Sequence, residues 1–334
     1  MTKNAIEVLG VSKRYGNQLA VDKLDFDVQR GEIFSLLGPN GAGKTTSIRM
    51  ILDIIKPDSG TIAVLGAPFT EATKAHIGYL PEERGLYKSV RLIELLTYLG
   101  TLKGMTSADA KKRANTLLDQ MGLGENKKSK LSELSKGMSQ KVQFIATILH
   151  RPELIIIDEP FSGLDPVNTE LIKSILYQLR TDGATIVMSL HEMHQIEAMA
   201  DRLLMMNRGQ RVLYGSVDEV RQQYAENAVI VSGIGDWGIL EGVLKVQQMD
   251  QAGRYFKLVL DAVTSPDQLL QHIALNNDCH IRSFELAVPS LNDIFLRVAG
   301  GVEVVTDGTA NGTIGQKNSR VNDLLAPSSE GARR

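Results

Sequence analysis

A glycine-rich loop, "GPNGAGKTT" at residues 38–46, constrains the fold of this chain more than any other feature. The short apolar run "IFSLL" precedes the loop, and the amphipathic run "KTTSIRMILDII" follows it. This order predicts a buried strand, a tight turn and a helix that starts inside the turn. Further apolar runs, "ELIIIDEP" and "ATIVMSLHE", alternate with helical segments downstream. We therefore expect an α/β fold with a mainly parallel sheet.

The loop fits the spacing G-x-x-x-x-G-K-[ST], which is typical of phosphate binding in P-loop NTPases. Its glycines let backbone N–H groups surround phosphate oxygens, and the N-terminus of the following helix adds positive potential. Lys44 is expected to reach the β- and γ-phosphates of a nucleotide, and the hydroxyl of Thr45 to bind Mg²⁺. The candidate nucleotide-binding residues of the loop are Gly38, Pro39, Asn40, Gly41, Ala42, Gly43, Lys44, Thr45 and Thr46.

Two acidic residues, Asp158 and Glu159, follow the apolar run "LIII". Asp158 at the end of a strand is expected to hold Mg²⁺. Successive side chains of an extended chain point to opposite sides, so Glu159 is expected to face the attacking water as the general base. The alternative is that Glu159 caps a loop and faces solvent. His191 follows a third apolar run and can reach the γ-phosphate, although a lone histidine there is more often a satisfied polar residue.

Two further stretches are ambiguous when taken alone. Tyr15, in "SKRYG", can stack on adenine or pack against neighbouring side chains. The stretch "SELSKGMSQK", residues 132–141, places Ser135, Lys136 and Gly137 at the start of a helix, where an anion is favoured. The first loop already supplies a phosphate site, so this second one raises the question of why a single chain has two.

The length of 334 residues predicts two domains. Amphipathic runs at about residues 86–150 predict a helical insert within a first domain that spans residues 1–223. Residues 224–300 are predicted to form a small α+β domain whose closing helix is capped by Ser290 with Asp293 and packs on that same domain. Residues 301–334 are rich in glycine, serine and asparagine, which predicts a disordered tail.

Composition excludes several classes of function. A net charge of -2 argues against a nucleic-acid-binding protein with a broad basic face. The single cysteine, Cys279, excludes an internal disulfide framework and suits a reducing compartment. The N-terminus lacks the apolar segment of a signal peptide, and no apolar run approaches the roughly 20 residues of a membrane-spanning helix. Any role at a membrane is therefore expected to depend on a partner.

The order of "GPNGAGKTT", "LSKGMSQ", "LIIIDEP", "SGLD" and a histidine resembles the ATP-binding subunit of an ABC transporter, over about residues 6–220. The resemblance implies ATP and Mg²⁺ as cofactors and a head-to-tail dimer. In such a dimer Ser135, Lys136 and Gly137 contact the nucleotide held by the other subunit, which accounts for the second phosphate site. Asp165, in "SGLD", belongs to a loop that crosses this interface, with a capped helix start as the alternative. Lys136 replaces a glycine of the family pattern.

Two stretches narrow the resemblance. "IGYLPEERGLY" and the closing "FELAVPSLNDIFL" are similar to ATP-binding subunits of ABC-2 type exporters, which have a small C-terminal domain. Most members of the family have a glutamine that senses magnesium where this chain has Glu82. The resemblance implies that Glu82 meets the metal directly or through water, with Glu83 as the alternative if the register shifts by one.

The resemblance implies an ATP-hydrolysing motor subunit of a membrane exporter, which clamps two ATP molecules in a dimer. Its partners would be an integral-membrane permease encoded separately and a second ATPase chain, identical or a sibling. The location implied is cytoplasmic, peripheral on the inner face of the cell membrane. One alternative is a soluble ABC-type ATPase that acts on ribosomes or DNA, but the single loop and the absence of sustained heptads argue against it. A nucleotide-dependent scaffold without turnover is disfavoured by Glu159 and His191.

Overall fold

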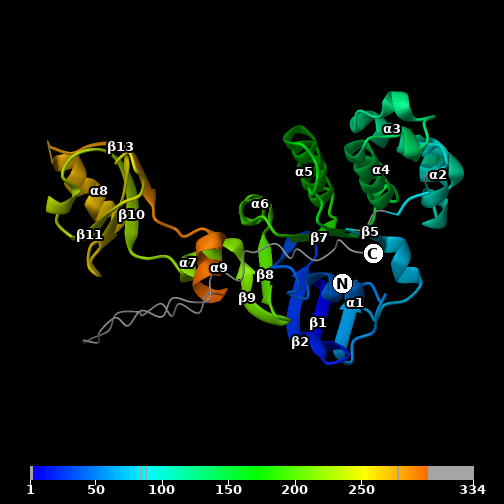
Figure 1. Ribbon diagram of the computed structural model, residues 1–334, viewed down its shortest axis with the longest axis horizontal. Coiled ribbons are helices and arrows are strands. Elements are labelled where there is room, and N and C mark those ends of the chain that lie inside the picture. The colour runs from blue at the N-terminus through cyan, green and yellow to red at the C-terminus, as the bar shows by residue number, and fades with distance from the viewer. Residues whose placement is uncertain (1–2, 83–84, 88, 277, 300–334) are drawn as a thin grey trace, which may run out of the picture.

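The computed structural model describes residues 3–82, 85–87, 89–276 and 278–299 (Figure 1). A six-stranded sheet with the order β5-β6-β7-β3-β8-β9 forms its centre. The strands are β3 (Ile33–Leu37), β5 (Ile77–Leu80), β6 (Leu154–Asp158), β7 (Thr185–Leu190), β8 (Arg202–Asn207) and β9 (Gln210–Ser216). Neighbours are parallel except in the β8–β9 hairpin, which confirms the predicted mainly parallel sheet. The carboxyl ends of β3, β6 and β7 therefore meet at one edge.

Both faces of this sheet are buried, which explains why its strands are continuously apolar. In β6, Ile155 and Ile157 belong to one hydrophobic cluster, and Leu154 and Ile156 belong to the other. The first cluster joins the sheet to α4 (Lys136–Ile148) and α5 (Pro166–Thr181). The alternation of side chains along each strand thus anchors the sheet between two layers.

The second layer is a three-stranded antiparallel sheet with the order β2-β1-β4, together with α1. These elements are β1 (Asn4–Tyr15), β2 (Gln18–Gln29), β4 (Ser59–Val64) and α1 (Lys44–Ile51). The helix α1 is shorter than the run "KTTSIRMILDII" predicted. It ends before Asp53, whose φ of 56° is incompatible with continued helix.

The predicted helical insert is present as α2 (Leu92–Leu102), α3 (Ser107–Gln120) and α4, which Figure 1 shows together at one end of the large domain. Its apolar side chains, among them Leu96, Leu118 and Ile145, are continuous with the first hydrophobic cluster of the sheet. Thr106 caps the N-terminus of α3, and its side chain accepts a hydrogen bond from the Asp109 backbone N–H. Shared burial ties the insert to the sheet rather than leaving it as a separate body.

A four-stranded antiparallel sheet with the order β11-β12-β10-β13 forms the small domain. The strands are β10 (Ala228–Ile234), β11 (Val243–Gln248), β12 (Tyr255–Leu260) and β13 (His280–Leu286), and the helix α8 spans Pro266–Leu275. Leu269 and Ile273 of α8 share a cluster with Val229, Val231 and Leu258 of the sheet. An α+β arrangement was predicted here, and it is confirmed.

The closing helix α9 (Leu291–Ala299) does not pack on the small domain, so that prediction is wrong. Leu291 and Ile294 are fully buried in the first hydrophobic cluster of the large domain. They pack with α6 (Met193–Met199), and Glu197 of α6 accepts a hydrogen bond from the Leu291 backbone N–H. Figure 1 shows α9 beside α7 (Val217–Gln223), away from β10–β13. Its N-terminus is capped by Ser290 and Asp293 as predicted.

Two predictions concern parts of the chain outside the described residues, namely the tail at residues 301–334 and the alternative metal contact Glu83. Over the ranges that the structure describes, every helix is too short or too polar to cross a membrane.

Candidate functional site

The glycine-rich loop connects the end of β3 to the start of α1 and takes a shape that requires glycine. Gly43 has a φ of 105°, and a Cβ atom there would lie 2.7 Å from the Ala20 backbone oxygen. Gly41 also has a positive φ, of 76°. A side chain at Gly43 would strain the backbone and collide with the Ala20 oxygen, and one at Gly41 would strain the backbone. The loop thus presents bare N–H groups to the cavity.

Lys44 is buried at the start of α1 and is held by the loop itself. Its Nζ donates hydrogen bonds to the Gly38 oxygen at 2.6 Å and to the Pro39 oxygen at 3.3 Å. Burial lowers the pKa of Lys44, while the carboxylates of Glu159, Asp158 and Glu82 act in the opposite direction. Three carboxylates thus surround one ammonium group, and the cavity has a net negative charge. Phosphates are also negative, so they suit this cavity only if a cation accompanies them.

Asp158 ends β6 with both carboxylate oxygens engaged. Oδ2 accepts a hydrogen bond from the Thr45 hydroxyl at 3.1 Å, and Oδ1 accepts one from the Ser189 hydroxyl. The residue is only 3% exposed, because β6 lies inside the sheet. Ser189 was not predicted from the sequence, because its relation to Asp158 depends on the pairing of β6 with β7. The arrangement fixes one carboxylate beside the hydroxyl that starts α1.

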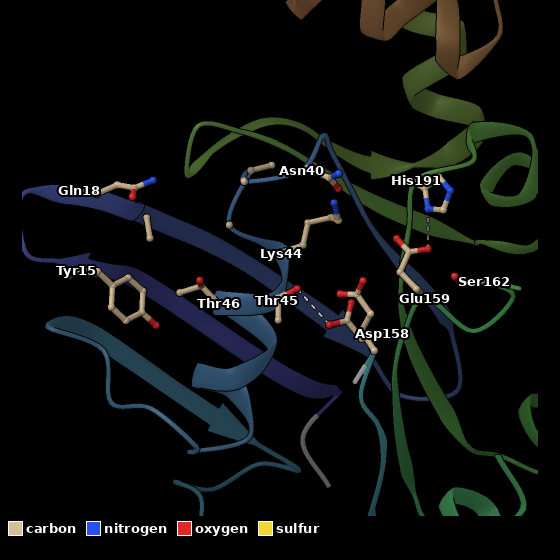
Figure 2. Close-up of a pocket in the computed structure, with 15 residues that line it drawn as sticks. Tyr15, Gln18, Asn40, Lys44, Thr45, Thr46, Asp158, Glu159, Ser162 and His191 are labelled. Atoms are coloured by element: carbon tan, nitrogen blue, oxygen red, sulfur yellow. Dashed lines mark hydrogen bonds and ion pairs between the residues drawn. The ribbon is translucent and has the colours of Figure 1, made fainter. Parts of the chain in front are cut away.

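Glu159 lies just beyond β6 and pairs with His191, as Figure 2 shows. The Glu159 Oε2 atom is 2.7 Å from Nδ1 of His191. Burial raises the pKa of Glu159, and the neighbouring His191 lowers it. The backbone φ of Glu159 is 54°, so the residue is not extended, and the predicted alternation of strand side chains does not hold at this position. A turn of the backbone, not strand alternation, brings both acidic side chains to the same cavity.

These side chains line a cavity of about 780 Å³ at the carboxyl edge of the central sheet. Figure 2 shows the predicted residues around it, contributed by β1, the loop, β6 and the end of β7. The predicted residues that line it are Tyr15, Asn40, Gly41, Ala42, Gly43, Lys44, Thr45, Thr46, Glu82, Asp158, Glu159 and His191. Gln18, Ala20 and Ser162 also line it and were not assigned to it from the sequence. Gly38 and Pro39 do not line it and instead hold Lys44 through their carbonyl oxygens.

Tyr15 and Gln18 form the outer end of this cavity. They are paired across the turn between β1 and β2, which explains how the sequence brings them together. Tyr15 is 48% exposed, so its ring is not packed into a core. The Nζ atom of Lys13 lies 5.9 Å from the centre of the ring. An open aromatic face with a nearby cation is suited to stacking on a base.

The predicted second phosphate site lies elsewhere. Ser135 caps α4 by accepting a hydrogen bond from the Met138 backbone N–H at 3.3 Å. Asp165 caps α5 by accepting one from the Asn168 backbone N–H at 2.9 Å. These two residues, together with Lys136 and Gly137, do not line the cavity that contains Lys44. Within one chain the structure therefore keeps the two candidate phosphate sites apart.

The side-chain oxygen atoms near Lys44 suit a Mg²⁺ ion that also binds oxygen atoms of a bound nucleotide. The Thr45 hydroxyl, Asp158 and Glu82 are hard oxygen donors in one cavity. Among the described residues, no group of three or more acidic, histidine or cysteine side chains could hold a metal by itself. Mg²⁺ commonly binds through one or two carboxylates with phosphate oxygens and water completing its shell. This donor set fits that pattern.

Comparison with known proteins agrees with the geometry. A family model described as ABC transporter matches residues 21–162, and one described as the C-terminal domain of ATP-binding protein DrrA1-3-like matches residues 215–299. The chain is 39% identical over 294 residues to the uncharacterized ABC transporter ATP-binding protein YhaQ of Bacillus subtilis (strain 168), covering 87% of this chain and 97% of YhaQ. It is 33% identical over 305 residues to the Nod factor export ATP-binding protein I of Rhizobium sp. (strain N33), covering 90% and 98%.

Solved structures support the same conclusion. One described as the ATP-binding subunit of an ABC transporter has a TM-score of 0.63 and 32% identity, covering 66% of this chain and 93% of that chain. This match covers about two thirds of the chain, and the family model for residues 215–299 covers the small domain together with α7 and α9. The chain belongs to the ATP-binding proteins of ABC transporters and is an ATPase with a DrrA-like C-terminal domain.

Proposed function

We propose that this ATPase is the motor subunit of a membrane exporter and hydrolyses ATP with Mg²⁺. The observation that carries the proposal is the meeting of a phosphate loop, Asp158 and the Glu159–His191 pair in one cavity. The export function is supported by the similarity to a Nod factor export protein over 90% of this chain. A separate permease would form the membrane path and determine what is transported.

The loop would bind the phosphates through its N–H groups and through Lys44. In the structure the Lys44 ammonium donates to Gly38 and Pro39, and phosphate oxygens would replace one or both of these acceptors. Thr45 and Asp158 would hold Mg²⁺, with Glu82 meeting it directly or through water. Bound Mg²⁺ would neutralise charge on the β- and γ-phosphates. Tyr15 would stack on adenine at the outer end of the cavity.

Glu159 would accept a proton from the attacking water. His191 lies 2.7 Å from its Oε2 atom and would fix the direction of the carboxylate. Burial raises the pKa of Glu159, which makes the carboxylate a stronger base as long as it remains ionised. The second nitrogen of His191, which lies 3.9 Å from Oε1 of Glu192, would turn to the γ-phosphate.

Turnover would require a head-to-tail dimer, with a second copy or a sibling chain. Ser135, Lys136, Gly137 and Asp165 lie outside the cavity of their own chain, which supports a role toward the nucleotide of the other chain. Ser135 caps the 13-residue helix α4. The positive N-terminus of α4 would face the γ-phosphate of the other chain when two chains close.

We also propose that the two domains of the chain have different functions. Residues 1–223 would bind the nucleotide, with the helical part at about 86–150, and residues 224–300 would form the accessory part. The helix α9 would tie the accessory part to the large domain, because Leu291 and Ile294 pack in the same cluster as Ile196 of α6. Binding to the permease would hold the chain at the inner face of the membrane.

The variant Glu159→Gln tests the catalytic assignment. The amide cannot take the proton from water, so we expect ATP turnover to fall at least about a hundredfold while ATP binding persists. Glu170→Gln, on the exposed side of α5, is the matched control and is expected to keep wild-type turnover. Turnover of Glu159→Gln within a few-fold of wild type would show that Glu159 is not the base.

Purification of the tagged full chain from membranes tests the transport assignment. Chemical crosslinking before detergent extraction is expected to yield a partner with several membrane-spanning helices. Recovery of a ribosome or DNA in place of such a partner would instead support the alternative function, an ABC-type ATPase that acts on ribosomes or DNA.

A further inference from the structure

Ser189 contacts Asp158 and Glu159, two of the three acidic residues that line the cavity. It lies in β7, between β6 and β3 in the central sheet, and is fully buried. Its hydroxyl donates a hydrogen bond to Oδ1 of Asp158. The same hydroxyl accepts a hydrogen bond from the Glu159 backbone N–H at 3.3 Å. One side chain, 31 residues along the chain from Asp158, is thus bonded to two successive residues of the site.

The first contact fixes the orientation of the Asp158 carboxylate. With Oδ1 held by Ser189, Oδ2 faces the Thr45 hydroxyl at 3.1 Å and the cavity beyond it. A Thr45 hydroxyl that bound a cation through an oxygen lone pair would keep its proton to donate to Asp158. Ser189 remains on the opposite oxygen, so the plane of the carboxylate stays fixed. A hydrogen bond to an ionised carboxylate is stronger than one between neutral groups.

The second contact supports an unfavourable backbone conformation at Glu159. A φ of 54° places this residue in the left-handed region, which is strained for a residue with a Cβ atom. The Glu159 N–H is shared between the hydroxyl and the backbone oxygen of Ser189, each at 3.3 Å. The position of the Glu159 carboxylate beside His191 depends on this turn.

Ser35 shows that a serine can be buried in this sheet without any contact of its hydroxyl with the acidic residues. It lies in β3, next to β7, and is also fully buried. Its Oγ atom has no hydrogen-bond partner within the described part of the chain. The two serines share strand environment and burial and differ in whether the hydroxyl reaches the acidic residues.

We propose that Ser189 is a positioning residue that orients Asp158 toward Mg²⁺ and holds the turn that presents Glu159. The inference rests on the proposed function, because it assumes Asp158 as the metal contact. Ser189 itself would touch neither nucleotide nor metal. Its removal would therefore act on metal-dependent binding and turnover, not on binding of the base or of metal-free phosphates.

The test compares the full chains of wild type, Ser189→Ala and Ser35→Ala. The affinity for a fluorescent ATP analogue is measured in EDTA and in Mg²⁺, and the ratio of the two affinities gives the gain from the metal. We expect this gain to fall about tenfold in Ser189→Ala, with the EDTA affinity unchanged within twofold. Ser35→Ala is expected to match wild type in both. Steady-state kinetics should show a loss in kcat for Ser189→Ala, and Ser189→Thr, which keeps the hydroxyl, should recover most of the gain.

Two outcomes would overturn the proposal. A metal gain in Ser189→Ala within twofold of wild type would show that the hydroxyl does not position Asp158. Equal loss of affinity in EDTA and Mg²⁺, with a lowered melting temperature and no recovery in Ser189→Thr, would show a merely structural serine. A wild-type chain without any metal gain would refute the metal assignment of the proposed function itself, which distinguishes that failure from a failure of Ser189 alone.

Discussion

Replacing His150 with glutamine tests how one buried imidazole makes the stability of this chain depend on pH. His150 follows α4, and its Nε2 atom lies 3.1 Å from the Ile77 backbone oxygen, an acceptor that requires a proton on Nε2. Its Nδ1 atom is buried without a hydrogen-bond partner in the described ranges. A second proton on the ring would therefore have no acceptor. Burial, with Lys103, Arg113 and His76 nearby, lowers the pKa of His150 from 6.5 to about 4.

The sign and size of the effect follow from the two pKa values. In the unfolded chain the imidazole takes up a proton as the pH falls through 6.5, whereas in the folded chain it does so only near 4. The unfolded state binds more protons in this window, so the free energy of unfolding falls as the pH falls. The expected loss is about 2 kcal/mol between about pH 7 and pH 5, and it approaches about 3 kcal/mol below pH 4.

Urea unfolding of wild type and His150→Gln at about pH 7 and about pH 5 measures the effect. Glutamine keeps an N–H that can donate to the Ile77 oxygen but cannot take up a proton, so the variant should lose about 2 kcal/mol less than wild type over this interval. His280→Gln, at an exposed histidine of β13, is the control and should follow wild type. Equal pH dependence in wild type and His150→Gln would refute the reasoning.

Three further predictions concern the cavity, the dimer and the closing helix. Lys44→Ala should weaken binding of a fluorescent ATP analogue at least about tenfold, because it removes the charge that meets the phosphates, and undiminished affinity would contradict that role. Ser135→Arg in the Glu159→Gln background should bind ATP yet elute as a monomer on a sizing column; a stable dimer, or loss of ATP binding by the monomer, would contradict a role across the interface. Ile294→Ala should lower the free energy of unfolding of the large domain by about 2–4 kcal/mol. Leu296→Ala, on the exposed side of the same helix, should change it little, and equal effects of the two would contradict the packing of α9.

Local patterns in the sequence were sufficient for the loop, the strands and most of the cavity. The shape of the nine-residue loop around Lys44 requires glycines, so the loop can be found from the local sequence alone. Runs such as "LIIID" are continuously apolar because both faces of the sheet are buried. Parallel strands bring their carboxyl ends to one edge. Asp158, Glu159 and His191 follow such strands, so their convergence in one cavity follows from topology.

The remaining features depend on contacts that a local pattern does not contain. Ser189 reaches Asp158 only through the register of β6 with β7, and a serine in an apolar run has no distinguishing signal. The left-handed turn at Glu159 replaces the alternation that was expected. The amphipathic pattern predicted the closing helix and its cap, but it placed the helix on the wrong domain, because the packing of Leu291 and Ile294 depends on contacts with residues far away in the sequence.

The packing of α9 on α6 also has a consequence for how the chain folds during synthesis. Ile196 and Met199 of α6 share a cluster with Leu291 and Ile294, which the ribosome makes only after β10–β13. Because synthesis proceeds at about 5–20 residues per second, the apolar surface of α6 stays without α9 for on the order of ten seconds. The helix α6, which begins just after His191, therefore gains its last packing partner only at the end of synthesis. A chain interrupted in the small domain would leave the apolar surface of α6 beside His191 exposed.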